Sequence, residues 1–418
     1  MCAVSSLLLV VEREARETLL ASSLQESDQL TVKENNATNI TPPPPEPLAI
    51  LRGHSVPVNA SSFLSSTRVV SGGADGVVKI WDLRSRRESA SVTTAHSKAG
   101  VLHASPLGSS SAARFVTQGR DGLVKVWDAA SFREGCEPLA SYYCGSFSFT
   151  KFATLRWPDT GTAGAADSEG EQCQGLQQAS DAVANGNLVV CPSAEGNHIL
   201  VYDCRATSSS PAFHMTPPDN ASNSSSSAKS KKGMCMSLSL FEATGVQTDS
   251  STQTFIGAGF ESGALAVLDL RSGGKIACEA QITLDSNPLL AFDVTRDGQS
   301  AICGSSGEDL FVAKFDAGSF ATSPRSFFKC NHGGMSAIRI RGDQRIFASA
   351  GWDHRVRVFH LRKLKPLAIL KHHTESVFGL DFSPDSSLLV SASKDHKIAL
   401  WSVYSPSTQA LRENLRAY

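Results

Sequence analysis

The sequence lacks several features that would place it in a common functional class. Its 39 lysine and arginine residues nearly balance its 40 aspartate and glutamate residues. No net positive field therefore draws the whole chain onto nucleic acid or an anionic membrane. No apolar stretch approaches the roughly 20 residues that a membrane-spanning helix needs. We therefore expect neither nucleic acid nor a membrane as a direct partner.

The ten cysteines form no CxxC pair and follow no regular spacing, which argues against a zinc site and against a disulfide framework. Cys330 and His332 stand close together, but no further ligand pair accompanies them. The start MCAVSSLLLVV has an apolar run of signal-peptide length, yet no basic residue precedes it and acidic residues follow. We expect no metal, no cofactor and a reducing cytoplasmic or nuclear location.

What the sequence does contain is repetition. The octapeptide PLAILRGH at residues 47–54 returns as PLAILKHH at residues 366–373. Alignment on an apolar run, a hydroxyl residue, an aspartate turn and a second apolar strand gives seven units. Four units are clear, and in each of them the hydroxyl residue precedes the aspartate by four positions. Their histidine, hydroxyl, aspartate and aromatic residues are His54, Ser71, Asp75 and Trp81 in unit one; His96, Thr117, Asp121 and Trp127 in unit two; His332, Ser349, Asp353 and Phe359 in unit six; and His373, Ser391, Asp395 and Trp401 in unit seven.

The three middle units are less regular. Residues 198–203, 257–270 and 303–316 keep a strand-turn-strand pattern but lose the histidine or the tryptophan. Two polar segments, about 157–187 and 207–232, contain too few large apolar residues to order themselves, so we expect disordered inserts there. We expect a flexible extension over residues 1–46, the repeats over 47–404 and a tail over 405–418.

Short alternating strands separated by glycine and aspartate turns, four to a unit, predict the blades of a β-propeller. The pair Gly53-His54 and the WD pairs at residues 81–82 and 127–128 resemble the WD-repeat family. The resemblance implies an all-β fold, a seven-bladed WD40 β-propeller. Unit seven ends directly after its third strand. We therefore predict that residues 47–51 supply the missing fourth strand and close the ring.

In the WD-repeat family the histidine lies before the innermost strand and the aspartate lies in the turn between strands two and three. The resemblance implies a buried relay in which the aspartate, histidine, hydroxyl and indole are hydrogen-bonded in series. The same residue types form the triad of some hydrolases, but here they recur in four units with an aromatic partner, which indicates a structural role. We expect no catalytic residue. Phe359 lacks an indole N–H, so the relay of unit six is expected to be weaker.

Residues 42–60, 349–370 and 391–404 resemble the ASTRA-associated branch of the WD-repeat family. The resemblance implies a monomeric, non-catalytic scaffold that acts with the TTT co-chaperone complex in the maturation of phosphatidylinositol-3-kinase-related kinases, and in fungi with a chromatin-associated assembly. Exposed aromatic and arginine residues are frequent interface anchors. The expected partner surface contains Trp352, His354, Arg355, His372 and His396, although Trp352 has the alternative of packing over a neighbouring blade.

Two other functions fit parts of the sequence. Residues 81–84 read WDLR, a box of the kind found in substrate receptors of cullin-RING ubiquitin ligases, in which Arg84 would contact the adaptor. Weaker echoes occur at residues 202–205 and 268–271. A heterotrimeric G-protein β subunit would need a longer N-terminal heptad helix than residues 7–24 can provide.

Overall fold

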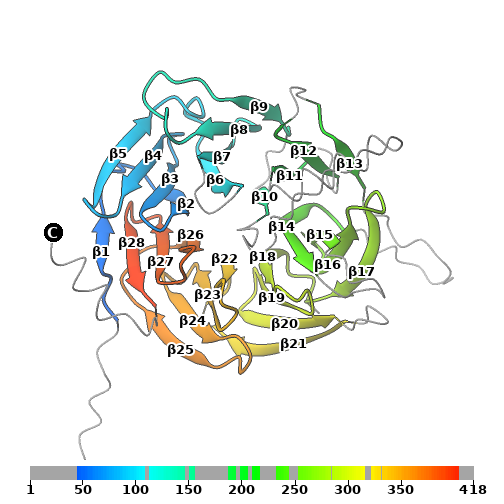
Figure 1. Cartoon of the computed structure of the whole chain (residues 1–418). Coiled ribbons are helices and arrows are strands. Elements are labelled where there is room, and N and C mark those ends of the chain that lie inside the picture. Colours follow the sequence, from blue (N-terminus) through cyan, green and yellow to red (C-terminus); the bar gives the residue numbers. More distant parts are fainter. Residues whose placement is uncertain are drawn as a thin grey trace, which may run out of the picture. The chain divides into compact units, whose positions relative to one another are not determined.

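The computed structural model describes residues 45–108, 113–145, 150–155, 187–193, 198–205, 210–216, 232–243, 253–283, 285–315, 322–330 and 332–403 (Figure 1). All of them belong to one unit, Pro45–Tyr418. The predictions for residues 1–44, for 156–186 and for the tail 405–418 lie outside the described residues. Within the described residues, no helix has the length and hydropathy to cross a membrane.

The described residues form seven antiparallel sheets of four strands each, which follow one another around a ring (Figure 1). Blade one comprises β2 (Val58–Ser65), β3 (Arg68–Gly73), β4 (Val78–Asp82) and β5 (Arg87–Val92); blade two β6 (Val101–Leu107), β7 (Arg114–Gly119), β8 (Leu123–Asp128) and β9 (Ala140–Tyr143); blade three β10 (Ala153–Thr154), β11 (Leu188–Pro192), β12 (Ile199–Asp203) and β13 (Phe213–Met215). Blade four comprises β14 (Cys235–Ala243), β15 (Gln253–Phe260), β16 (Ala264–Asp269) and β17 (Lys275–Gln281); blade five β18 (Leu289–Val294), β19 (Ser300–Ser305), β20 (Asp309–Phe315) and β21 (Thr322–Lys329). Blade six comprises β22 (Met335–Ile340), β23 (Ile346–Gly351), β24 (Val356–His360) and β25 (Pro366–Leu370); blade seven β26 (Val377–Phe382), β27 (Leu388–Ser393), β28 (Ile398–Ser402) and β1 (Ala49–Leu51). The predicted seven-bladed β-propeller is confirmed.

The core lies between the blades. The second strands β23 and β27 are buried along their whole length, because both faces of each sheet pack against a neighbouring blade. Outer strands such as β25 are largely accessible. One apolar cluster joins Val70 of blade one to Phe115 and Trp127 of blade two. Full burial of a side chain such as Phe115 contributes roughly 1.5 to 3 kcal/mol.

In two blades, a glycine at the same position of the second strand allows close approach of the neighbouring blade. A Cβ atom at Gly72 would lie 2.4 Å from Val101 of the next blade. At the matching position of blade five, a Cβ atom at Gly304 would lie 2.7 Å from Met335 of blade six. Both distances are shorter than a van der Waals contact, so a larger residue would push the two sheets apart.

The two ends of the repeats meet in blade seven. Strand β1 pairs antiparallel with β28, with Ala49 opposite Leu400 and Leu51 opposite Ile398. The other copy of PLAIL forms β25, the outermost strand of blade six. The duplicated sequence therefore has the same role in both blades, and the predicted closure of the ring by an N-terminal strand is confirmed. Because β1 pairs with β28, the edge of this third strand of blade seven is not exposed.

Carboxylates on the innermost strands add polar links between blades. Asp381 of β26 is buried and accepts hydrogen bonds from the Ser62 hydroxyl at 2.5 Å and from the Phe63 amide at 3.0 Å in blade one. Asp293 of β18 accepts a bond from the Ile340 amide of blade six at 2.7 Å. These links supplement the apolar contacts at the junctions of blades seven and one and of blades five and six.

The structure corrects the boundary of the second insert. Strand β13 lies inside the segment 207–232 that we expected to be disordered, and it pairs with β12 through Phe213 opposite Val201. Lys232, at the end of the same segment, is buried and forms an ion pair with Glu279 at 3.1 Å. Polar composition hid β13, because a three-residue outer strand needs few apolar side chains.

Candidate functional site

The complete relay is present in blade seven. The Asp395 carboxylate lies 3.0 Å from Nδ1 of His373, and Nε2 of His373 lies 2.8 Å from the Ser391 hydroxyl. The Trp401 indole N–H donates to the same hydroxyl oxygen at 2.9 Å. This arrangement fixes the tautomer, with the His373 proton on Nδ1 and the Ser391 proton directed to Nε2. Burial alone would raise the pKa of Asp395, but hydrogen bonds from His373 and from two backbone amides lower it to about 2.

Blade two contains the same relay with threonine as the hydroxyl residue. Nδ1 of His96 lies 3.1 Å from both oxygens of Asp121, and Nε2 lies 2.8 Å from the Thr117 hydroxyl. The Trp127 indole donates to Thr117 at 2.8 Å. The bond and charge of His96 hold the pKa of Asp121 below its usual value, although burial acts in the opposite direction. Four side chains from two loops and two strands are therefore fixed relative to one another.

The relay of blade one lacks its carboxylate bond. His54 Nε2 lies 2.8 Å from the Ser71 hydroxyl, which also accepts the Trp81 indole N–H at 2.8 Å. Nδ1 of His54 is buried and has no hydrogen-bond partner within the described ranges, while Asp75 accepts the Val77 amide instead. Burial, assisted by the charge of Lys79, lowers the pKa of His54 to about 4. This histidine is therefore neutral at physiological pH.

Blade six departs from the predicted relay. His332 is exposed, and among the described residues its Nδ1 contacts the backbone oxygen of Gly333 alone. The Asp353 carboxylate is instead bound by the buried Arg357 guanidinium at 2.5 and 3.1 Å. The Ser349 hydroxyl has no hydrogen-bond partner in the part of the chain that the structure describes, because Phe359 has no N–H to donate. The prediction that His332 belongs to a relay is not met, and Arg357, which sequence reasoning missed, holds the aspartate turn.

The backbone explains why His332 is displaced. The His96 amide donates to the carbonyl of Gly76 in the preceding blade. At the entry to blade six the corresponding bond is made by Cys330, whose amide donates to Glu308. Cys330 is buried, and burial raises the pKa of its thiol. Cys330 therefore occupies the position of the histidine.

The middle blades replace the relay with apolar residues. In blade three Cys144 makes the entry bond to Gly122, Cys191 takes the hydroxyl position and Tyr202 takes the indole position. In blade five the same positions are held by three residues that carry no polar group matching the relay, namely Ile282, Cys303 and Ala313. Burial raises the pKa of the Cys191 thiol well above its usual range, so it stays neutral.

The relay hydroxyls have no access to a substrate. Ser71, Thr117 and Ser391 are each 0% exposed, and each already accepts an indole N–H. A nucleophile must reach the reacting atom, which these hydroxyls cannot do. Among the described residues, no group of three histidine, cysteine or carboxylate side chains is placed to hold a metal ion. The arrangement can fix loops but offers no reaction centre.

The loops that enter each blade and the turns between second and third strands lie at one end of the antiparallel strands, and we call this end the relay-loop face. Three large apolar side chains are exposed there: Trp352 at 39%, Tyr143 at 63% and Met234 at 46%. The Trp352 ring lies directly over Gly334, where a Cβ atom would approach the ring to 2.1 Å. Trp352 therefore packs on the loop that enters its own blade and keeps its other side open.

The other members of the expected partner surface differ in accessibility. His354 and His396 are exposed in the aspartate turns of blades six and seven, and both have a φ of 67°. Arg355 is half-buried. His372 turns inward, with its ring 6.2 Å from that of Trp401 and its Nε2 buried without a partner. Burial, with the neighbouring His373, lowers the pKa of His372. We therefore regard His372 as a support for the surface.

Arg84 lies at the opposite end of the strands, in the turn that follows β4. Its side chain is exposed and has no partner among the described residues, whereas Trp81 of the same WDLR box is buried. Arg205, in the weaker match to this box at residues 202–205, differs because its guanidinium binds Asp203 at 2.9 Å. Of these two arginines, only Arg84 has a free guanidinium.

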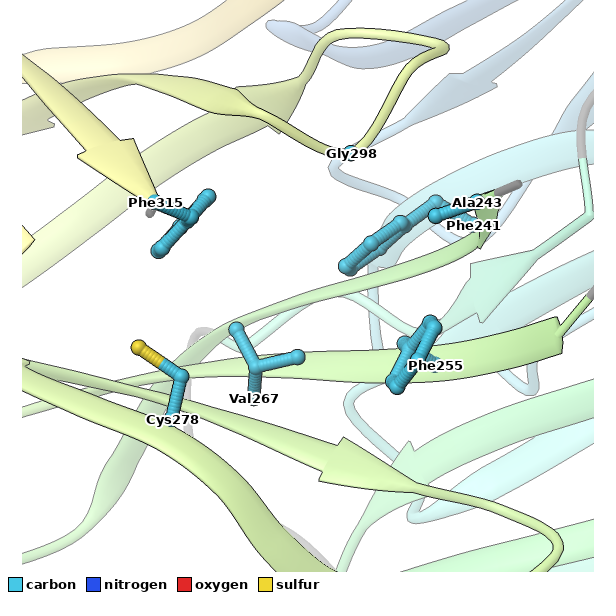
Figure 2. Close-up of a pocket in the computed structure, with 7 residues that line it drawn as sticks. All are labelled: Phe241, Ala243, Phe255, Val267, Cys278, Gly298 and Phe315. Carbon is cyan, nitrogen blue, oxygen red and sulfur yellow. The ribbon is translucent and has the colours of Figure 1, made fainter. Parts of the chain in front are cut away.

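An apolar cleft lies on the face opposite the relay loops, between blades four and five (Figure 2). It is lined by Phe241, Ala243, Phe255, Val267, Cys278, Gly298 and Phe315. Its one titratable lining group is Cys278, and burial raises the pKa of that thiol to about 11. The cleft has no polar group that would orient a reacting substrate.

Lys151 is a second residue that sequence reasoning missed. It precedes β10 of blade three, and its ammonium group donates to the carbonyls of Ser336 at 3.0 Å and Phe378 at 2.8 Å. Those carbonyls belong to the innermost strands of blades six and seven, on the other side of the ring. Burial, with the charge of Arg339, lowers the pKa of Lys151 to about 7. No sequence signal distinguishes this lysine from a surface lysine.

The sequence is similar to a protein-family model and to several known proteins. The WD40 family model, described as WD domain, G-beta repeat, matches residues 45–82 and 364–402. The chain is 28% identical over 371 residues to guanine nucleotide-binding protein subunit beta-like protein 1 of Mus musculus, covering 87% of this chain and 98% of the relative. It is 27% identical to ASTRA-associated protein 1 of Aspergillus flavus, covering 82% and 84%. Identity to ASTRA-associated protein 1 of Schizosaccharomyces pombe reaches 47%, over 78 residues that cover 19% of this chain and 21% of the relative.

Proposed function

Because this chain is a WD40-repeat protein related to guanine nucleotide-binding protein subunit beta-like protein 1 and ASTRA-associated protein 1, we propose that it is a non-catalytic scaffold for protein–protein interaction. WD40 propellers typically act as scaffolds of this kind. The buried relay hydroxyls support this proposal, since they are closed to substrate. The chain would serve as a rigid platform whose faces bind proteins.

The observation that carries the proposal is the placement of Trp352. This tryptophan is held over Gly334, and its backbone carbonyl accepts the Ser376 hydroxyl at 3.1 Å. It therefore presents an aromatic surface with little freedom to lose on binding, which is the property of an interface anchor. Tyr143 and Met234 are exposed on the same face.

The finer proposal is that the partners are the TTT co-chaperone components and, through them, phosphatidylinositol-3-kinase-related kinases and chromatin-associated assemblies. Its support is the similarity to ASTRA-associated protein 1 over most of the chain. The chain would act as a monomeric propeller within such a complex, in the cytoplasm, the nucleus or both. It would bind no nucleic acid or membrane directly.

Affinity purification of the tagged full chain from its native organism, with mass spectrometry, tests the finer proposal. We expect TTT components to be recovered in excess over a tag-only control. Recovery of other partners without TTT components would contradict the co-chaperone role and leave the scaffold role standing. Recovery of no protein above the control would contradict both.

The binding face is tested by comparing Trp352→Ala with Leu139→Ala. Leu139 is 59% exposed and lies at the opposite end of the strands, so it provides a matched control of similar accessibility. We expect partner recovery to fall severalfold for Trp352→Ala and to stay unchanged for Leu139→Ala, with both variants folded by circular dichroism. Equal recovery for the two variants would contradict the assignment of this face.

A second candidate is a substrate receptor of a cullin-RING ligase. The observation that favours it is the exposed Arg84, whose guanidinium is free among the described residues. Co-purification of the ligase adaptor that is lost on Arg84→Ala, with Arg87→Ala as the control, would support it. Adaptor recovery that does not depend on Arg84 would exclude the box as the contact.

A further inference from the structure

On the relay-loop face of blades six and seven, the acidic side chains are paired within the protein, whereas several basic side chains are not. Its carboxylates are occupied within the protein: Asp353 by Arg357, Asp395 by His373, and Glu375 by Lys394 at 3.6 Å. None of these three is left to attract a basic partner. The charged groups on this face that remain unpaired are therefore cationic.

Besides the half-buried Lys397 in the aspartate turn of blade seven, three cationic side chains on this face have no partner among the described residues. Arg355 lies in the aspartate turn of blade six, beside Trp352. Lys371 is exposed in the loop between blades six and seven, and Arg52 is exposed in the loop between blades seven and one. Arg52 is close enough to His372 for its charge to help lower the pKa of that histidine, after the larger effects of burial, His373 and Lys397. The three cations and Trp352 thus lie on the loops of three consecutive blades.

We propose that this surface, formed by Trp352, Arg355, Lys371 and Arg52, binds an acidic segment of a partner protein that also carries an apolar anchor residue. The inference rests on the proposed role of this face as the partner surface. The apolar anchor would pack on the open side of Trp352. Carboxylates on either side of it would pair with the arginine fork of Arg355 and with the two flanking cations.

The charges of an acidic segment would complement those of this surface. A basic or neutral segment would leave three like charges unpaired beside an aromatic ring, whereas an acidic segment neutralises them and gains from electrostatic steering. Lys371 and Arg52 are exposed and Arg355 is half-buried, so the attraction is screened over a Debye length of about 8 Å at physiological salt. Binding should therefore weaken as ionic strength rises.

The test uses the full chain and fluorescein-labelled peptides of about twelve residues, which share a central Leu-Trp pair and differ only in containing zero, four or eight glutamates among serines. Fluorescence anisotropy at low salt measures their affinity. We expect affinity to rise with glutamate number and to fall ~tenfold on Arg355→Glu, with a similar fall on Lys371→Glu. Arg362→Glu is the matched control, because Arg362 is exposed in the same blade but follows β24 at the opposite end of the strands.

An affinity that does not change with glutamate number would overturn the proposal. So would equal losses for Arg355→Glu and Arg362→Glu, or an affinity independent of salt. Circular dichroism of each variant separates misfolding from lost binding, and Arg355→Gln provides a milder variant that keeps the turn. If the acidic peptides bind as expected while purification recovers no TTT component, the co-chaperone role fails and the acidic-segment surface stands.

Discussion

The blades on either side of the ring closure and the blades opposite it hold their loops in different ways. Blades seven and two fix the entry loop to the aspartate turn through histidine, hydroxyl and indole, and blade one uses all but the carboxylate. Blade three places two cysteines and a tyrosine at the same positions, and blade five places isoleucine, cysteine and alanine there. Both groups form complete four-stranded sheets. The sheets therefore form without the relay, and the relays add rigidity to the loops of one face.

The largest expected effect comes from removing the strand that closes the ring. Deletion of residues 46–52 removes β1 and exposes the edge of β28, so we expect cooperative unfolding to be lost. Deletion of residues 1–40 leaves β1 in place and should leave the urea-unfolding midpoint and slope unchanged. Cooperative unfolding with the normal slope after loss of β1 would show that blade seven is stable with three strands.

The next largest effect on the free energy of unfolding distinguishes blade seven, which has a complete relay, from blade six, in which His332 joins no relay. His373→Leu removes one partner of a buried pair and leaves Asp395 without its side-chain donor, which should lower the free energy of unfolding by roughly 3 to 5 kcal/mol. His332→Leu alters an exposed side chain and should change it by less than about 0.5 kcal/mol. Urea unfolding at pH 7 measures both. Similar losses for the two variants would contradict the structural distinction between blades seven and six.

The relays of blades one and seven should respond to different pH ranges. The pKa of His54 is lowered to about 4, so between pH 6.5 and 4 the unfolded chain binds a proton that the folded chain does not. Stability linked to His54 is present above pH 6.5 and falls by up to ~3 kcal/mol as the pH drops to 4. The pKa of Asp395 is lowered to about 2, so its contribution is lost only below pH 4.

Urea unfolding between pH 7 and 4 measures the His54 contribution. Replacement by a neutral group, His54→Asn, should remove most of the slope in this range. An unchanged slope in the variant would mean that another group causes the loss.

The smallest effect comes from a matched pair of hydroxyl deletions. Ser391→Ala removes an oxygen that is bonded to both His373 and Trp401, and should lower the free energy of unfolding by about 1 to 3 kcal/mol. Ser349→Ala removes a buried hydroxyl without a partner and should leave stability unchanged or slightly higher. A loss for Ser349→Ala equal to that for Ser391→Ala would indicate an unrecognised partner of Ser349.

The sequence alone was sufficient for the propeller, its blade number and its closure, because the repeats recur with fixed spacing and PLAIL appears at both ends. It was also sufficient to bring together the relay residues of blades two and seven. The sequence wrongly predicted His332 as the relay histidine of blade six. Cys330, two positions earlier, makes the backbone hydrogen bond to Glu308 and so takes the position that the histidine has in blade two. Lys151 could not be predicted, since its partners are backbone carbonyls more than 180 positions away, in blades that only the closed ring brings near.

The most direct test of the account is a pair of double-mutant cycles. In blade seven, His373→Ala combined with Asp395→Ala should show a coupling energy of roughly 1.5 to 3 kcal/mol in the free energy of unfolding, because the two side chains are hydrogen-bonded. In blade six, His332→Ala combined with Asp353→Ala should show none within error, because Asp353 is bound by Arg357. Equal coupling in the two blades, or coupling in blade six alone, would contradict the account.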